Sequence, residues 1–197
     1  MGSGSHSKSG GKKVSEERLF VAVDLPIEVR KVLKRTAESM ELNNARYSRL
    51  DQMHLTLRFL GNVPEDQKEC LIHELENISL HSFNLRTDAF GVFPKRGMPR
   101  ILWAGLKKDD VLNELQKTIE ESAEKCGFEA DNKPWHPHIT LARLKGRNHI
   151  TPEVLEEASN QNETMMFPVD AFYLYHSELK KSGAVYSILK TFELEQG

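Results

Sequence analysis

Hydrophobic residues recur along the chain with two different periods, and this predicts short β-strands that alternate with α-helices. The run RLFVAVDL, residues 18–25, is rich in β-forming side chains, so we expect a strand there. Pro26 follows, and apolar residues then return every three or four positions as far as Met40, which is typical of an amphipathic helix. The same two patterns continue to the end of the chain. They predict further strands at residues 53–61, 83–93, 100–106, 136–144, 167–179 and 184–194, and further helices that begin near Pro64, Asp109 and Thr151.

Turn-forming and capping residues indicate where several of these elements begin or end. Gly61 should stop the second strand, and Asp109 or Asp110 should cap the long helix that Gly127 ends. Residues 180–183 should form the turn between the last two strands.

The order strand, helix, strand, helix, strand occurs twice, which predicts an internal duplication. An offset of 84 positions places His54 on His138 and gives weak similarity in sequence but good similarity in pattern. We therefore expect an α+β fold in which residues 16–197 form a single bilobal domain of two sheet-and-helix lobes. Residues 1–15 are rich in Gly, Ser and Lys and are predicted to be a flexible tail or a cloning remnant.

The composition favours a globular protein with a small or terminal ligand. Hydrophobic residues make up 39% and charged residues 28% of the 197 positions, and the net charge is −2. A protein that binds long duplexes is usually clearly basic. No apolar run is long enough to predict a membrane span. Cys70 and Cys126 form no disulfide framework and are expected to be ordinary buried thiols. A cytoplasmic monomer is the resulting expectation.

One short motif occurs in both halves: HLTL at His54 to Leu57 and HITL at His138 to Leu141. In a strand, alternate residues share a face, so His54 projects with Thr56 and His138 with Thr140. If the two lobes are related by approximate two-fold symmetry, these two polar faces meet across one cleft. The aliphatic neighbours should point into the core, namely Leu55, Leu57, Ile139 and Leu141.

Two imidazoles and two hydroxyls suit in-line displacement at phosphorus without a metal. One histidine can accept a proton while the other donates one, and the hydroxyls can bind phosphate oxygens. The simpler alternative is that each pair makes only local hydrogen bonds on a half-exposed strand. A metal site is a weaker alternative, because each strand supplies one histidine and no carboxylate or thiol at i+2 or i+4, although His136 could join His138.

The landmarks around these motifs resemble the 2H phosphoesterases, specifically the RNA 2',3'-cyclic phosphodiesterases once called 2'-5' RNA ligases. The matching stretches are RLFVAVDLP, HLTLRFLGNV, FGVFPKRGMPRILWAGL, HPHITLARL and LYHSELKKSGAVYSIL. The resemblance implies a bilobal fold with the active cleft between the lobes and hydrolysis of a 2',3'-cyclic phosphate to a 2'-phosphate. RNA 3' ends or small cyclic nucleotides would be the substrates, with no cofactor and no metal. It also implies that His54 donates a proton, that His138 accepts one, and that Thr56 and Thr140 hold the phosphate.

Three arginines are further candidates for substrate binding. Arg58 is in phase with His54, whereas Arg143 is out of phase with His138 and needs a twist or bulge to reach the cleft. Arg100 precedes a strand. Stacking on a base is open to several aromatic residues, although core packing is the more common role: Phe59, Phe93, Trp103, Trp135 and Tyr173.

Two other functions use the same predicted cleft. A module that binds RNA ends or nucleotides would hold the phosphate without turning it over. A 2'-5' ligase would run the reaction in reverse with the same acid and base.

Overall fold

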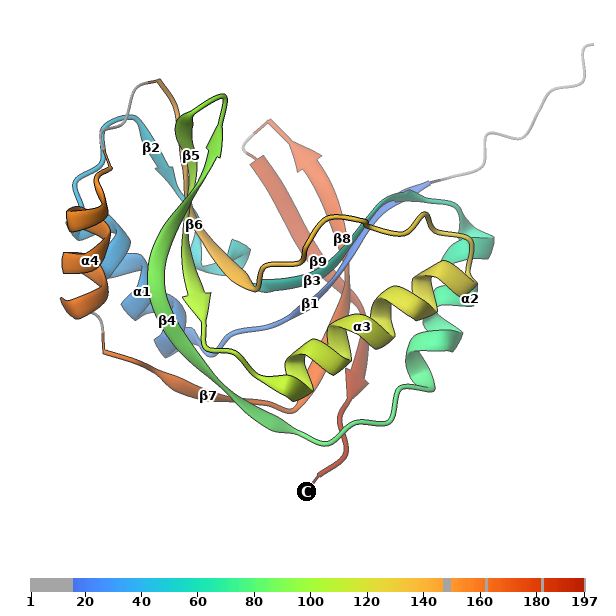
Figure 1. Cartoon of the computed structure of the whole chain (residues 1–197). Coiled ribbons are helices and arrows are strands. Elements are labelled where there is room, and N and C mark those ends of the chain that lie inside the picture. Colours follow the sequence, from blue (N-terminus) through green and yellow to red (C-terminus); the bar gives the residue numbers. More distant parts are fainter. Residues whose placement is uncertain (1–15, 147–149, 162, 182, 197) are drawn as a thin grey trace, which may run out of the picture.

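The chain forms one curled antiparallel sheet with two pairs of helices outside it (Figure 1). This computed structural model describes residues 16–146, 150–161, 163–181 and 183–196, so the predicted tail at residues 1–15 lies outside the described part. The strands are β1 (Glu17–Val23), β2 (Ala45–Tyr47), β3 (Leu55–Val63), β4 (Phe83–Lys95), β5 (Met98–Leu106), β6 (His138–Leu144), β7 (Met166–Val169), β8 (Ala171–Lys180) and β9 (Gly183–Glu193). The helices are α1 (Ile27–Ser39), α2 (Glu65–Glu76), α3 (Asp110–Lys125) and α4 (Pro152–Gln161), with a short 3-10 turn η1 (Leu50–Gln52).

The order of the strands reveals two matching half-sheets. It runs β7-β4-β5-β6-β3-β1-β8-β9, with β2 added beside β6. We call β3, β1, β8 and β9 the first half-sheet and β6, β5, β4 and β7 the second. The two strands that carry the repeated motif, β3 and β6, meet in the middle. The predicted duplication is therefore visible in the topology, but the last two strands return to the first half-sheet.

The two half-sheets are joined by few backbone contacts where β3 meets β6, and we call this junction the seam. Along the fully described strands β3 and β6, the ladder contains a single residue pair, Leu55 with Ile139. Side chains bridge the strands on either side of that pair. Ser48 Oγ donates to the carbonyl oxygen of Thr140 at 2.9 Å, and Trp135 Nε1 donates to the carbonyl oxygen of Thr56 at 3.2 Å. Each segment that leads into one motif is thus bonded to the backbone of the other.

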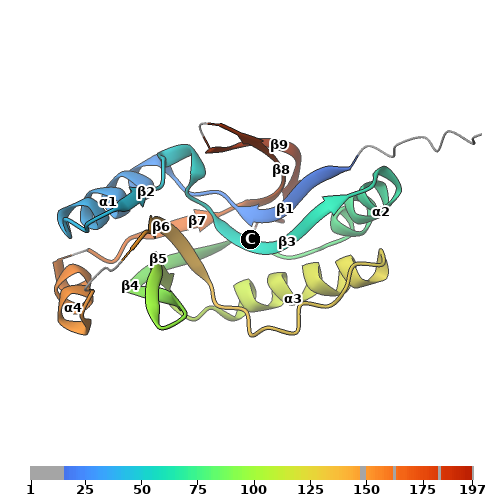
Figure 2. The same cartoon turned by 90° about the horizontal axis from the view of Figure 1, so that it is seen from above.

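The helices cover the convex side of the sheet and cross the seam. Helix α1, which follows β1 of the first half-sheet, contacts β6 and α4, whereas α3, which follows β5 of the second, contacts β3 and α2. Figure 2 shows α1 and α4 gathered at one end and α2 and α3 at the other. No helix in the described ranges is long and apolar enough to span a membrane.

The core under these helices confirms the predicted alternation of the motif strands. Leu55, Leu57, Ile139 and Leu141 are each at most 2% exposed. The capping of α3 is also as predicted: the Asp109 side chain accepts from the N–H of Leu112 at 2.8 Å, and Gly127 follows the helix with φ +82°.

Two predicted strand boundaries are wrong. Residues 167–179 are not one strand, because the chain breaks at Asp170 and crosses from β7 on β4 to β8 on β1. Pro168 cannot donate to a ladder, and it lies in β7 at the outer edge of the second half-sheet, where no donor is needed. Gly61 does not stop β3 either. It takes a left-handed φ of +77°, and the strand continues to Val63.

The prediction of two free thiols is also wrong. Cys70 on α2 and Cys126 at the end of α3 form a disulfide with a Cα–Cα distance of 5.7 Å. Sequence reasoning missed this because the two residues are 56 positions apart and become neighbours only when α2 packs on α3. The scarcity of cysteine supported the predicted cytoplasmic location, and the disulfide removes that support, since disulfides are uncommon in the cytosol.

Reduction should lower the stability of the protein measurably. Closing a loop of this size restricts the unfolded chain and contributes about 4 kcal/mol in the chain-entropy treatment. Urea denaturation with and without dithiothreitol measures the difference, and the C70S/C126S double variant should match the reduced wild type. An oxidised wild type whose midpoint equals that of the double variant would contradict the prediction.

Candidate active site

The single backbone pair at the seam gathers the four polar motif residues on one face. Leu55 pairs with Ile139 in antiparallel register, so His54 lies opposite Thr140 and Thr56 lies opposite His138. All four side chains are half-buried and point away from the core that holds their aliphatic neighbours. The two histidines are diagonal to one another across this pair, and they are close enough for His138 to contribute to the lowered pKa of His54.

The leucine that ends each motif is a β-bulge. In β3 the register passes from Thr56 opposite Ala22 to Arg58 opposite Val21, which leaves Leu57 unpaired. In β6 it passes from Thr140 opposite Trp103 to Ala142 opposite Leu102, which leaves Leu141 unpaired. The bulges stand at equivalent positions in the two halves. Each turns two successive residues toward the core and reverses the phase of the strand beyond them.

These bulges decide which side chains share the concave face with the histidines. The predicted phase of Arg58, in step with His54, is wrong: the bulge buries Arg58, and Phe59 emerges on the face instead. In β6 the equivalent bulge buries Ala142 and turns Arg143 outward on the face of His138 and Thr140.

The other two arginines lie in different surroundings. Arg58 forms ion pairs with Glu120 on α3 and with Asp131 in the loop that follows α3. Arg100 donates from Nη1 to the carbonyl oxygen of Gly146 at 3.1 Å, beyond the end of β6. Of the three predicted arginines, the structure therefore brings only Arg143 to the face that carries the four motif residues.

The His138 ring is held by the backbone of the residues just before β6 and by neighbouring aromatic side chains. Its Nδ1 lies 2.8 Å from the carbonyl oxygen of His136, so Nδ1 carries a proton and donates, which leaves Nε2 free to accept one. Phe93 meets the His138 ring edge-on at a centroid distance of 4.7 Å, and Trp103 meets His136 at 4.8 Å. Trp103 lies flat against Gly91, where an added Cβ would stand 2.1 Å from the indole.

His54 belongs to a stack of three rings. Phe20 stacks on His54 at a centroid distance of 4.8 Å and on Tyr175 at 5.0 Å, and the Tyr175 ring is also 6.1 Å from that of His54. Tyr186 meets both Phe20 and His54 edge-on. The Tyr175 hydroxyl donates to Asp24 at 3.2 Å, and Asp24 is ion-paired with Arg30. The stack thus fixes the plane of the His54 ring from behind.

Burial and neighbouring charges keep both imidazoles neutral near pH 7. Burial, which is the largest cause, together with the positive charge of Arg30 and the interaction with His138, lowers the pKa of His54 to about 4. A hydrogen bond to the backbone of Gln52 opposes the shift. Burial also lowers the pKa of His138, against the hydrogen bond to His136.

Sequence reasoning missed several residues around this site. Phe20, Tyr175 and Tyr186 surround His54, but their strands gave no polar motif to draw attention to them. Period-two alternation in residues 18–25 is the one signal that could have placed Phe20 on the face opposite the core.

The five aromatic residues predicted as candidates for stacking on a base lie in different surroundings. Phe59 is 66% exposed beside Phe20, Phe93 and Trp103 surround the His136–His138 segment, Tyr173 contacts Tyr175, and Trp135 bonds to the backbone of β3.

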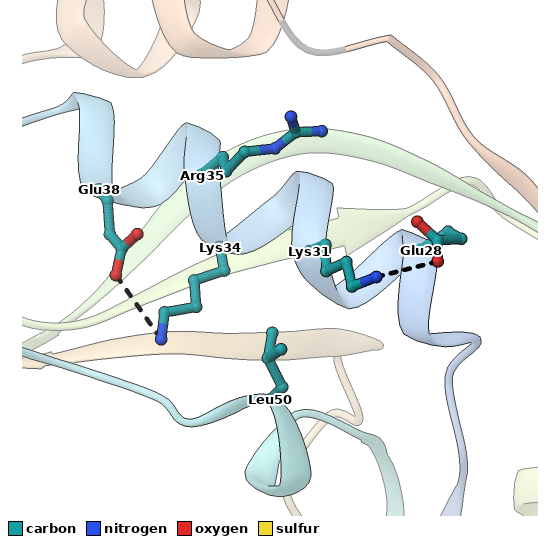
Figure 3. A pocket seen from close by; sticks show the side chains of 6 residues that line it. All are labelled: Glu28, Lys31, Lys34, Arg35, Glu38 and Leu50. Carbon is teal, nitrogen blue, oxygen red and sulfur yellow. Dashed lines mark hydrogen bonds and ion pairs between the residues drawn. The ribbon is translucent and has the colours of Figure 1, made fainter.

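A hollow lies on the outside of α1, away from the His/Thr cluster, with a volume of about 320 Å³ (Figure 3). Two ion pairs neutralise most of its charge, Lys31 with Glu28 at 3.2 Å and Lys34 with Glu38 at 3.7 Å. None of its lining residues belongs to the His/Thr cluster. In the described ranges, no three side chains of His, Cys, Asp or Glu converge as metal ligands.

Comparison with known proteins decides the family. The profile of the 2'-5' RNA ligase superfamily matches residues 25–181. This chain belongs to the 2'-5' RNA ligase superfamily. Among the relatives, the RNA 2',3'-cyclic phosphodiesterase of Archaeoglobus fulgidus is 30% identical over 177 residues, which cover 89% of this chain and 99% of that protein. The protein of the same name from Thermus thermophilus is 35% identical over 186 residues and 90% of each chain.

Solved structures of the 2'-5' RNA ligase superfamily share this fold. E. coli LigT in its apo form superposes with a TM-score of 0.76 at 28% identity, over 92% of this chain and 99% of LigT. LigT complexed with 3'-AMP gives 0.77 at 27% identity and the same coverage. The predicted α+β fold of the superfamily is therefore confirmed.

Acid should destabilise the protein through His54. The folded state binds the His54 proton only near pH 4, whereas an ordinary histidine binds it near 6.5. Between these values the unfolded state takes up more protons, so stability should fall as the pH drops from about 6.5 to 4. Urea midpoints across this range should fall less steeply in His54→Gln than in wild type. His73→Gln, at an exposed site on α2, is the control, and equal slopes in wild type and His54→Gln would contradict the prediction.

Proposed function

We propose that this protein hydrolyses 2',3'-cyclic phosphate ends of RNA to 2'-phosphates, with His54 and His138 as acid and base and without a metal. The observation that carries the proposal is the Leu55–Ile139 pair, which gathers two imidazoles and two hydroxyls on one concave face. The names of the relatives support the substrate class, since both proteins described above are RNA 2',3'-cyclic phosphodiesterases.

In the proposed reaction, His138 removes a proton from water through its free Nε2, and the water oxygen forms a bond to phosphorus. The bond from phosphorus to the 3' oxygen breaks, and His54 donates a proton to that oxygen. The products are a 2'-phosphate and a 3'-hydroxyl. Thr56 and Thr140 donate hydrogen bonds to the non-bridging oxygens, and Arg143 offers a positive charge on the same face.

The division of acid and base between the histidines comes from the family resemblance. Both rings donate to a backbone carbonyl two residues earlier, so their hydrogen bonds do not distinguish them. With a pKa of about 4, the His54 ring carries almost no extra proton near pH 7 in the ligand-free protein, so it has none to donate. We infer that the negative charge of the bound phosphate raises this pKa, so that His54 is protonated when the substrate is in place.

A second function uses the same site. The family name favours 2'-5' ligation, in which a 5'-hydroxyl takes the place of water, forms a bond to the phosphorus of a 2',3'-cyclic phosphate and displaces the 3' oxygen, with the same acid and base. Water at its bulk concentration favours hydrolysis. A module that binds nucleotides without catalysis is the remaining alternative, and the activity assay below separates it from the enzyme.

Replacement of either histidine should abolish most of the activity. General acid–base catalysis contributes about 10²–10⁴-fold for each group, so His54→Ala and His138→Ala should each lose that much in kcat. The assay uses oligonucleotides with 2',3'-cyclic phosphate ends, resolves 2'- from 3'-phosphate products, and is repeated with EDTA, which should change nothing. His73→Ala is the control. Near wild-type hydrolysis by either site variant, or loss of activity in EDTA, would refute the proposal.

Product binding should raise the pKa of His54. Titration of the histidine rings by NMR should place His54 near pH 4 in the free protein, and saturation with adenosine 2'-phosphate should move its midpoint toward neutrality. The ring of His73 should not respond. An unchanged His54 midpoint in the saturated protein would show that the phosphate does not lie beside this imidazole.

A further inference from the structure

Arg58 occupies an unusual place for a charged side chain. The bulges of β3 and β6 make it equivalent to Ala142, and both residues face the core. In β6 a small residue occupies this position. Arg58 is nevertheless only 8% exposed, and a buried guanidinium is unfavourable unless other groups compensate its charge.

Within the described ranges, the ion-pair and hydrogen-bond partners of Arg58 come from α3 and the loop that follows it. Nε lies 3.3 Å from a carboxylate oxygen of Glu120, Nη1 lies 3.6 Å from Asp131, and Nη2 donates to the carbonyl oxygen of Glu129. Glu120 also accepts from the N–H of Asp131 at 2.9 Å. One guanidinium thus fixes the beginning of this loop to β3, the strand that begins beside His54.

The same loop leads directly into the second motif. Beyond Asp131 it carries Trp135, whose indole N–H bonds to the carbonyl oxygen of Thr56, and then His136, whose carbonyl oxygen orients His138. Because β3 and β6 share a single ladder pair, the alignment of the two motifs depends on such contacts outside the ladder. Arg58 anchors the loop that makes the Trp135 contact with β3 and that carries the carbonyl oxygen bonded to His138.

We propose that Arg58 is a positioning residue that sets the placement of His138 relative to His54 through the loop of residues 129–137. Arg58 touches neither histidine and need not touch the substrate. This inference rests on the proposed function for its kinetic consequence, but its structural consequence, the protection of the Trp135 indole N–H, is independent of any activity.

Arg58→Ala should lower kcat about 10- to 100-fold and leave KM within about threefold, because small misplacements of catalytic groups slow the chemical step. Arg58→Lys should recover part of the loss, since a lysine can pair with Glu120 but cannot make all three contacts. Glu17→Gln is the matched control. It removes the ion pair from Lys68 to β1 without touching the loop, and its kcat should stay within about twofold of wild type.

Exchange of the Trp135 indole N–H, followed by NMR, is the second measurement. It should be faster in Arg58→Ala than in wild type and unchanged in Glu17→Gln. Kinetics are compared at a temperature where circular dichroism shows each variant folded, and Arg58→Lys serves if Arg58→Ala does not fold.

Three results would overturn the inference. The first is that the Arg58 variants keep both the wild-type exchange rate of the Trp135 indole N–H and the wild-type kcat. The second is that KM rises in the Arg58 variants while kcat stays constant. The third is that Glu17→Gln loses as much kcat as Arg58→Ala. Wild-type protein without cyclic phosphodiesterase activity would instead refute the proposed function, while faster exchange in the Arg58 variants would still support the loop anchor.

Discussion

The structure depends on one backbone contact, the pairing of Leu55 with Ile139 between the two half-sheets. A longer ladder would hold β3 and β6 side by side along their whole length. A single pair lets the two strands diverge on either side of it. That pair also fixes the register, so a histidine of each strand lies opposite a threonine of the other. A slip by one residue would turn the aliphatic residues outward and bury the imidazoles, and the free energy of the core opposes it.

The fourth residue of each repeated motif, a leucine, forms the β-bulge of its strand. Leu57 and Leu141 keep their side chains in the core while they change the phase of the strand beyond them. The same device then gives different results in the two halves. After the first bulge an aromatic residue, Phe59, reaches the concave face, and after the second an arginine, Arg143, does so. A duplicated backbone therefore supports an asymmetric surface.

The aromatic side chains around the histidines influence the pKa of the imidazoles as well as their positions. Stacked rings beside His54 exclude water from one side of the imidazole, and this burial is the largest cause of its lowered pKa. Two neutral imidazoles beside a cationic residue form a site that gains protons when an anion arrives. The protonation state of such a site is set by its ligand as much as by the solvent pH.

The sequence by itself predicted most of the helices and long strands, the duplication and the four motif residues, because all of these depend on periodicity along the chain, whereas it gave no sign of the short β2 or of the break between β7 and β8. Alternation predicted which side chains of β3 and β6 enter the core, and helical spacing and capping residues predicted α1 and α3. The register shifts that bury Arg58 and turn Arg143 outward were decided only in the tertiary structure, because a bulge depends on the partner strand. The same holds for the Cys70–Cys126 disulfide, the crossing of the chain at Asp170 and the ring stack on His54. Each joins segments far apart in sequence, and local propensity carries no information about which distant segment becomes the neighbour.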